Sequence, residues 1–129
     1  MTNKEPSFYF CNECNVIIEE IQGNQSDYSC NGKQLKKLTA NSTEAATEKH
    51  LPQVDYSGNI VTVNVGSVSH PMSEEHSIEW VYLQTKNGCQ KVNLKPNEAP
   101  IAKFALIDGD TPIAAYAYCN LHGFWKTEF

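Results

Sequence analysis

The sequence predicts an all-β protein: an immunoglobulin-like sandwich of about seven short strands, preceded by a small β unit. Two observations carry this prediction. Runs of alternating apolar and polar residues recur between residues 59 and 126, and Gly, Pro, Asn and Asp separate them. No stretch of the 129 residues has the apolar periodicity of a long helix. A change in composition near residue 38 divides the chain into an expected N-terminal unit (1–38) and an expected sandwich domain (39–129).

The N-terminal unit is predicted from its cysteines. Cys11 and Cys14 form a Cys-x-x-Cys motif between two apolar runs, and Cys30 follows at a distance. This pattern is typical of a tetrathiolate metal site, but Asn31 stands where a fourth thiolate is needed. We expect this unit to fold without metal or to bind one weakly. A three-thiolate zinc site, completed by water or by a neighbouring group, is the alternative.

Residues 38–48 are rich in Thr, Asn, Ser and Ala, which indicates a linker. It is expected to end in a short helical turn that Asn41 or Ser42 caps.

The strands of the sandwich are predicted from side-chain alternation and turn residues. Val61, Val63 and Val65 fall on one face of the run 59–66. The run after His76 is expected to place its apolar side chains on one face in the same way. The residues of that face are Ile78, Trp80 and Tyr82. The remaining expected strands are 90–94 after an Asn-Gly turn, 101–107, 113–119 after the Asp108-Gly109-Asp110 turn, and 124–126.

Composition excludes several classes of function. A net charge of -5 and an isoelectric point near 5.3 argue against nucleic-acid binding, because no basic stripe is present to neutralise phosphates. No apolar run is long enough to cross a membrane, and the polar N-terminus lacks the core of a signal peptide, so a cytoplasmic location is expected. The odd count of five cysteines then favours metal or structural roles over disulfides.

Cys119 ends the apolar run 116–119 and His122 follows three positions later. Gly123 permits a tight turn that would aim both side chains at one point. Alone this pair is a weak signal, since a buried cysteine and a loop histidine are common. The other three histidines, His50, His70 and His76, also lie at loops or strand ends. A sandwich gathers its loops at its ends, where all five side chains would have to meet.

The ligand count favours iron for such a site. Four imidazoles and one thiolate exceed what tetrahedral zinc normally takes, and mixed nitrogen and sulfur donors suit iron better than magnesium or calcium. Five ligands leave one octahedral position open. An axial thiolate favours redox chemistry on a small oxygen species over hydrolysis.

Three segments of the chain closely resemble the superoxide reductase family, the desulfoferrodoxins and neelaredoxins. They are Glu48-Lys49-His50, Ser67 to Trp80 with Ser69-His70-Pro71-Met72-Ser73-Glu74-Glu75-His76 at its centre, and Ala117-Tyr118-Cys119-Asn120-Leu121-His122-Gly123. The resemblance spans nearly the whole chain.

The resemblance implies one mononuclear iron with His50, His70, His76 and His122 in the equatorial plane and Cys119 axial. It further implies an oxidoreductase that reduces superoxide to hydrogen peroxide at the open position. Glu48 resembles the carboxylate that closes on the oxidised iron, and Lys49 the cation that attracts superoxide and organises proton delivery. A solvated surface pair is the alternative for Glu48 and Lys49.

The two-iron branch of this family carries a second, desulforedoxin-like centre with two adjacent cysteines where this chain has Cys30-Asn31. The missing thiolate predicts that a second iron is absent. The resemblance also implies a rubredoxin-like electron donor and a homodimer. A non-catalytic electron-transfer module and a structural zinc domain are the alternative functions.

Overall fold

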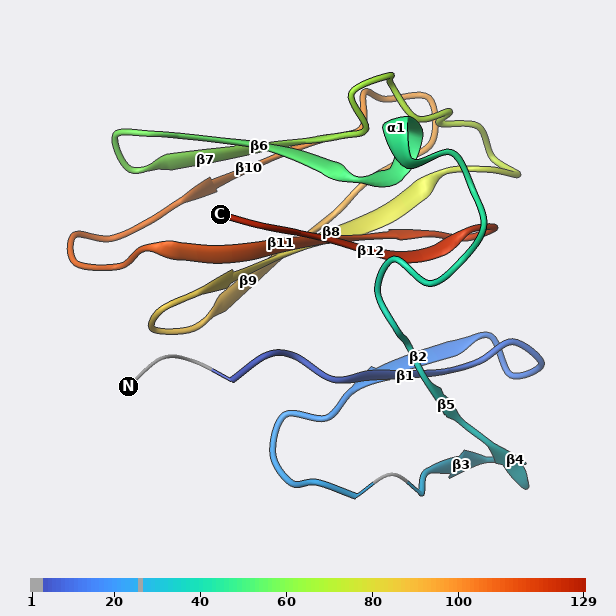
Figure 1. The fold of residues 1–129 in the computed structure, drawn as a ribbon. Coiled ribbons are helices and arrows are strands. Elements are labelled where there is room, and N and C mark those ends of the chain that lie inside the picture. Colours follow the sequence, from blue (N-terminus) through green and yellow to red (C-terminus); the bar gives the residue numbers. More distant parts are fainter. Residues whose placement is uncertain (1–3, 26) are drawn as a thin grey trace. The chain divides into compact units, whose positions relative to one another are not determined.

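The computed structural model describes residues 4–25 and 27–129. Residues 1–3, with which the predicted N-terminal unit begins, and Ser26 lie outside this range. The described chain divides into two compact units, 4–39 and 40–129. Figure 1 shows both as β structures joined by a single connection.

The N-terminal unit has five short strands: β1 (Phe8–Cys11), β2 (Val16–Glu19), β3 (Ser29–Cys30), β4 (Lys33–Gln34) and β5 (Lys36–Lys37). They form a three-stranded antiparallel sheet in the order β2-β1-β5 and a separate β3-β4 hairpin. Tyr9, Cys11 and Leu35 make a small buried core, against which Val16 and Tyr28 pack.

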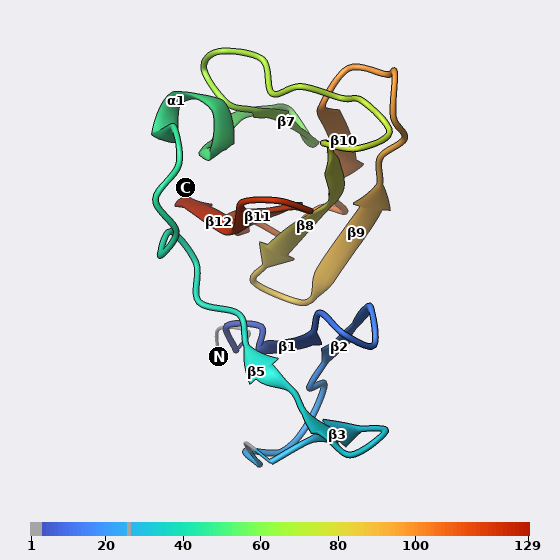
Figure 2. The same cartoon turned by 90° about the vertical axis from the view of Figure 1, so that its right-hand side faces the viewer.

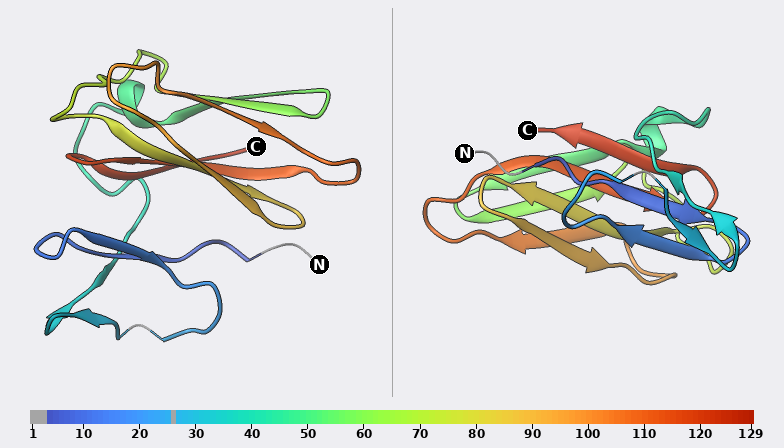
Figure 3. Two further views of the ribbon diagram at one scale, coloured as in Figure 1. Left: turned by 180° about the vertical axis from the view of Figure 1, so that it is seen from behind. Right: turned by 90° about the horizontal axis from the view of Figure 1, so that it is seen from below.

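The larger unit is a two-layer sandwich of seven strands, as the sequence predicts. The first sheet has the order β10-β7-β6 and the second β12-β11-β8-β9, all pairs antiparallel. Figure 2 and the left panel of Figure 3 show the two layers from different sides. The strands are β6 (Pro52–Ser57), β7 (Ile60–Val65), β8 (Ile78–Thr85), β9 (Cys89–Asn93), β10 (Ile101–Ala105), β11 (Pro112–Cys119) and β12 (Gly123–Glu128).

The core between the layers comes from side chains that alternate along these strands. Val61, Val63 and Val65 are completely buried, which confirms the predicted face of β7. Burial of each of these valine side chains stabilises the fold by roughly 2 kcal/mol. Cys119, at the end of β11, belongs to the same buried cluster. The core therefore continues to the end of the sandwich where β11 stops.

The predicted face of β8 is wrong. Ile78 joins the core with Val81 and Leu83, whereas Trp80 stacks on Tyr118 on the other side of the sheet, with ring centroids 5.6 Å apart. A register shift between β8 and β11 at Tyr118 and Cys119 is the physical cause, because an irregularity in pairing breaks the period of two.

The linker ends in a four-residue helix, α1 (Thr47–His50), in agreement with the predicted helical turn. Its predicted cap is wrong: Ala46 is the N-cap residue and gives no side-chain hydrogen bond. Asn41 instead bonds the backbone of Lys126 through both ends of its amide, which ties the linker to β12. In the described part of the chain, no helix is long and apolar enough to cross a membrane.

Candidate metal centre

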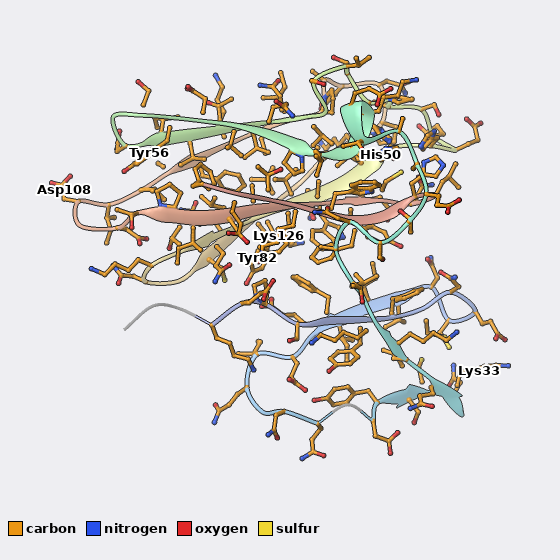
Figure 4. All side chains as sticks on the ribbon, viewed as in Figure 1. Lys33, His50, Tyr56, Tyr82, Asp108 and Lys126 are labelled. Carbon is orange, nitrogen blue, oxygen red and sulfur yellow. The ribbon has the colours of Figure 1, made fainter. Side chains whose placement is uncertain are left out.

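Five side chains meet at one end of the sandwich. His50 ends α1, His70 and His76 lie in the segment between β7 and β8, Cys119 ends β11, and His122 lies in the turn to β12. One ligand atom from each lies within 4.8 Å of all the others. Figure 4 labels His50 at this end of the sandwich and Asp108 at the opposite end. The fold therefore brings together all five residues that the sequence analysis expects to bind iron.

The four imidazoles follow one another around a ring. The centroid distances are 4.6 Å for His50 and His70, 4.6 Å for His70 and His76, 5.0 Å for His76 and His122, and 4.9 Å for His122 and His50. Neighbouring planes are nearly perpendicular, at 74° to 83°. Imidazoles that follow one another in this way can each offer a ring nitrogen to one shared cation.

The ring nitrogens are spaced for a metal ion. His50 Nε2 lies 3.1 Å from His70 Nε2 and 3.2 Å from His122 Nδ1. Two metal–nitrogen bonds of about 2.1 Å at a right angle would separate their nitrogens by about 3 Å. The spacing therefore fits ligands that share one ion.

Backbone carbonyls orient two of the rings. His50 Nδ1 lies 2.8 Å from the Ala46 oxygen, and His70 Nδ1 lies 2.6 Å from the Pro71 oxygen. A carbonyl accepts a hydrogen bond, so each Nδ1 carries the proton and each Nε2 has its lone pair free for a metal. His122 differs, because its Nδ1 is the nitrogen that faces the cluster.

Electrostatics favour the neutral form of three of the imidazoles, those of His50, His70 and His76. Burial lowers the pKa of His50 and His76, and it lowers that of His70 to about 4. Neighbouring imidazoles, and Lys49 in the case of His50 and His76, act in the same direction. A neutral imidazole is the form that binds metal, so no proton has to be displaced at neutral pH.

Cys119 completes the group from the buried side. Its Sγ lies 3.9 Å from His122 Nδ1 and accepts the backbone N–H of His122 at 3.4 Å. Burial raises the pKa of the thiol, while backbone N–H groups of Leu121 and His122 oppose this rise. These N–H groups point at a sulfur that would be negatively charged as a metal ligand.

His76 gives an independent test of whether a metal fits. Its Nε2 is buried and has no hydrogen-bond partner. A buried polar atom without a partner costs about 1–3 kcal/mol. A metal ion bound by the neighbouring nitrogens would supply that missing partner, so these residues fit a metal.

Residues that the sequence analysis did not select hold the histidines in place. Ser73 Oγ accepts the His76 N–H at 3.1 Å, and the Asn120 side chain bonds the backbone on both sides of His76. Trp125 stacks on His50 and donates to the His122 carbonyl at 3.1 Å. Asn120 and Trp125 lie close to Cys119 and His122 in sequence. This proximity is the sequence signal that could have indicated their role.

Gly66 has a similar role for α1. Its φ is +84°, and an added Cβ would lie 2.6 Å from the Lys49 oxygen and 2.7 Å from the Glu48 oxygen. The Val68 N–H also bonds the Glu48 carbonyl at 2.8 Å. The chain after β7 therefore packs directly on the backbone that carries Glu48, Lys49 and His50.

Glu48 and Lys49 have exposed side chains next to the buried His50. Lys49 is close enough to His50 and His76 for its positive charge to lower the pKa of both. The exposed Lys49 therefore lies near the centre.

The three N-terminal cysteines lie in the other unit. The Cys14 N–H donates to Cys11 Sγ at 3.3 Å, and the Cys14 thiol donates to the Cys30 carbonyl at 3.3 Å. Hydrogen bonds with the thiols of Cys11 and Cys30 raise the pKa of Cys14 to about 12. Asn31 adopts a positive φ of 50° in the turn between β3 and β4.

A β-sandwich with four histidines and one cysteine converging at one end defines a class of protein, that of metalloproteins with a mononuclear nitrogen and sulfur site. The comparisons with known proteins are specific. The desulfoferrodoxin family model matches residues 42–128. The chain belongs to the desulfoferrodoxin family.

Individual relatives agree with this assignment over nearly the whole chain. A desulfoferrodoxin from Clostridium acetobutylicum is 39% identical and covers 98% of both chains. One from Nitratidesulfovibrio vulgaris is 41% identical, covering 93% of this chain and 94% of that one. The superoxide reductase structure from Treponema pallidum has a TM-score of 0.84 at 38% identity, covering 97% of this chain and 100% of the other.

A superoxide reductase from Giardia intestinalis matches a smaller part of the chain. Its TM-score is 0.52 at 37% identity, and it covers 64% of this chain and 97% of its own.

Proposed function

We propose that this protein is a superoxide reductase. His50, His70, His76, His122 and Cys119 would together hold a single iron. The observation that carries the proposal is the ring of four imidazoles beside a buried thiol, with one nitrogen, His76 Nε2, lacking any partner. Names of relatives such as the Treponema pallidum and Giardia intestinalis proteins support the same activity.

Iron bound there would supply the one electron that, with two protons, converts superoxide into hydrogen peroxide. As a ligand, the Cys119 thiolate would donate electron density to the iron, which would favour reduction of an oxygen species over hydrolysis. The electron must be replaced after each turnover, and we propose a rubredoxin-like donor.

Lys49 attracts the substrate. The protein has a net charge of -5, which would repel superoxide at long range. Salt screens charges beyond about 10 Å, so a local cation decides the potential at the mouth of the site. Lys49 is exposed and influences both His50 and His76. We propose that Glu48, next to Lys49 on α1, would be the carboxylate that approaches the oxidised metal.

The remaining proposals concern the whole chain. We propose one iron per chain, because Asn31 replaces the fourth thiolate of the N-terminal unit, and we propose that this desulforedoxin-like unit supports a homodimer.

The yield of peroxide tests the reaction directly. Reduced, iron-loaded protein is mixed with a known amount of superoxide in the presence of an electron donor, and hydrogen peroxide is measured. A reductase forms one peroxide per superoxide consumed. Half that yield would indicate dismutation, and unchanged decay of superoxide would leave a non-catalytic metal module; either result would refute the proposal.

A further inference from the structure

The sequence contains two Asn-Gly pairs, Asn31-Gly32 and Asn87-Gly88, and each lies in the turn of a β-hairpin. An Asn-Gly pair is chemically labile, because glycine has no side chain to shield the backbone nitrogen that can attack the asparagine amide. The two turns differ in how firmly the structure holds that nitrogen. This difference indicates which of the two pairs reacts.

The Asn87-Gly88 turn is firmly held. The Gly88 N–H donates to Thr85 Oγ1 at 3.1 Å, and the Asn87 N–H donates to a carboxylate oxygen of Asp110 at 3.1 Å. The Thr85 N–H also donates to the Gly88 carbonyl at 2.9 Å. Thr85 is buried, and its strand β8 pairs with both β9 and β11. The attacking nitrogen of this pair is therefore engaged in a hydrogen bond next to a well-paired strand.

The Asn31-Gly32 turn is held much less firmly. Both residues are exposed, and their φ values of 50° and 75° belong to a tight two-residue turn. The strands on either side, β3 and β4, have two residues each and form a sheet of their own. One further bond, from the Leu35 N–H to the Tyr28 carbonyl at 2.8 Å, closes the hairpin. Within the part of the chain that the structure describes, no atom accepts the Gly32 N–H.

The length of the β3-β4 hairpin makes local opening easy. A two-stranded hairpin is marginally stable by itself, and segments with few buried contacts open at a low cost in free energy. Attack on the amide requires the backbone of Asn31 to leave the turn conformation, so that the Gly32 nitrogen can reach the side-chain carbonyl carbon. The rate of attack therefore follows the population of the open hairpin.

We propose that Asn31 is a site of spontaneous deamidation and that Asn87 is protected from it. The Gly32 nitrogen forms a bond to the side-chain carbonyl carbon of Asn31 and gives up its proton, while the bond from that carbon to the amide nitrogen breaks and ammonia leaves. Water then opens the five-membered imide at one of its two carbonyls, which gives aspartate or isoaspartate. Only water is consumed, and no electron is transferred. This inference does not rest on the proposed reductase activity.

The two products differ in their effect on the N-terminal unit. Isoaspartate adds one methylene to the backbone between residues 31 and 32, which disturbs the pairing of Cys30 with Lys33. Figure 4 labels Lys33, the residue after this turn. Tyr28, which packs against the small core of this unit, lies just before β3 and is expected to loosen with it. Aspartate keeps the backbone and adds only a negative charge.

Peptide mass spectrometry of aged protein tests the proposal. The full chain, with its thiols kept reduced, is incubated in mildly alkaline buffer, both folded and unfolded in guanidinium chloride. Digestion at acidic pH prevents further deamidation. The ratio of the unfolded to the folded rate gives the protection at each pair, independent of neighbouring residues. We expect protection at Asn87 to exceed that at Asn31 by about tenfold or more, because the Gly88 nitrogen must first lose its hydrogen bond to Thr85.

Two variants make the test specific. Thr85→Val removes the acceptor of the Gly88 N–H, so it should raise the rate at Asn87 by about fivefold or more and leave the rate at Asn31 unchanged. Asn31→Asp carries the new charge without the extra methylene, so the amides of β3 and β4 should exchange hydrogen more slowly in it than in aged protein that contains isoaspartate. Equal protection at the two pairs, or an Asn87 rate unaffected by Thr85→Val, would overturn the proposal.

Discussion

The indole of Trp125 stacks on the imidazole of His50, with ring centroids 5.0 Å apart and planes inclined by 23°. The same indole donates its N–H to the His122 carbonyl at 3.1 Å. One side chain on β12 therefore fixes two histidines that are 72 residues apart in sequence. Residues that orient ligands in this way usually contribute a factor of about 10–100 to metal affinity.

Trp125→Ala is expected to lower iron affinity by about 10–100-fold, because His50 loses its stacking partner and His122 its backbone bond. Trp125→Phe keeps an aromatic face and should lose less. Trp80→Ala is the matched control, since Trp80 stacks on Tyr118 and not on a histidine. Competition with an iron chelator measures all three variants; an equal loss in Trp125→Ala and Trp80→Ala would indicate general destabilisation only.

Asn120 positions His76 relative to Cys119. Its side-chain oxygen accepts the Ser77 N–H at 3.0 Å, and its amide donates to the Glu75 carbonyl at 2.8 Å. Asn120→Ala removes both bonds and is expected to weaken iron binding about tenfold. Asn120→Asp keeps the acceptor for Ser77 but loses the donor, so its loss should be smaller.

The readout that separates positioning from stability is the thiolate absorption band of the oxidised protein. We expect this band to shift in Asn120→Ala, because the Cys119 turn is no longer tied to the His76 segment. An unchanged band and unchanged iron affinity in a folded variant would exclude Asn120 from positioning the centre.

Lys49→Ala should slow the reaction with superoxide and flatten its dependence on ionic strength, while iron remains bound. Stopped-flow or pulse-radiolysis rates across a salt series measure both effects. Lys86→Ala changes the net charge equally but lies beside Asp110, toward the end of the sandwich where Figure 4 labels Asp108. If both variants gave the same salt dependence, net charge rather than a local cation would explain the attraction.

The metal-free protein should lose stability as the pH falls. Burial lowers the pKa of His50 and His76, and that of His70 to about 4 from an ordinary value of 6.5. Below about pH 6.5 the unfolded chain therefore binds protons that the folded chain does not, and each such histidine lowers the free energy of unfolding by up to roughly 1.4 kcal/mol per pH unit.

This stability is fully present above pH 6.5 and is lost toward pH 4, the value for His70. Urea unfolding of the metal-free protein at pH 7.0, 6.0 and 5.0 measures it. A flat profile over this range would contradict the lowered pKa values.

The sequence predicts much of the fold because alternation carries it directly. Val61, Val63 and Val65 are buried as their spacing requires, and the histidines lie at strand ends that a sandwich brings together. The face of β8 was mispredicted, because the register shift opposite Tyr118 depends on pairing with β11 and leaves no trace in the local pattern. Short-range periodicity cannot report such long-range irregularities.

The expected metal ligands could be selected from their residue types and from family resemblance. The residues that hold these ligands in position could not be selected in this way. Asn120 bonds Glu75 and Ser77 across more than 40 positions, and Asn41 bonds Lys126 across 85. Gly66 is required because the backbone of α1 lies 2.6 Å from where its Cβ would be. These contacts arise only when the two sheets and the linker are assembled.

The most direct test of the central claim is an optical spectrum of the purified protein before and after oxidation, paired with elemental analysis for iron and zinc on the same sample. The account predicts one iron per chain and a thiolate charge-transfer band that appears on oxidation, fades on reduction and is absent in Cys119→Ser. A protein that stays colourless, with zinc or no metal bound after anaerobic reconstitution with iron, would contradict it.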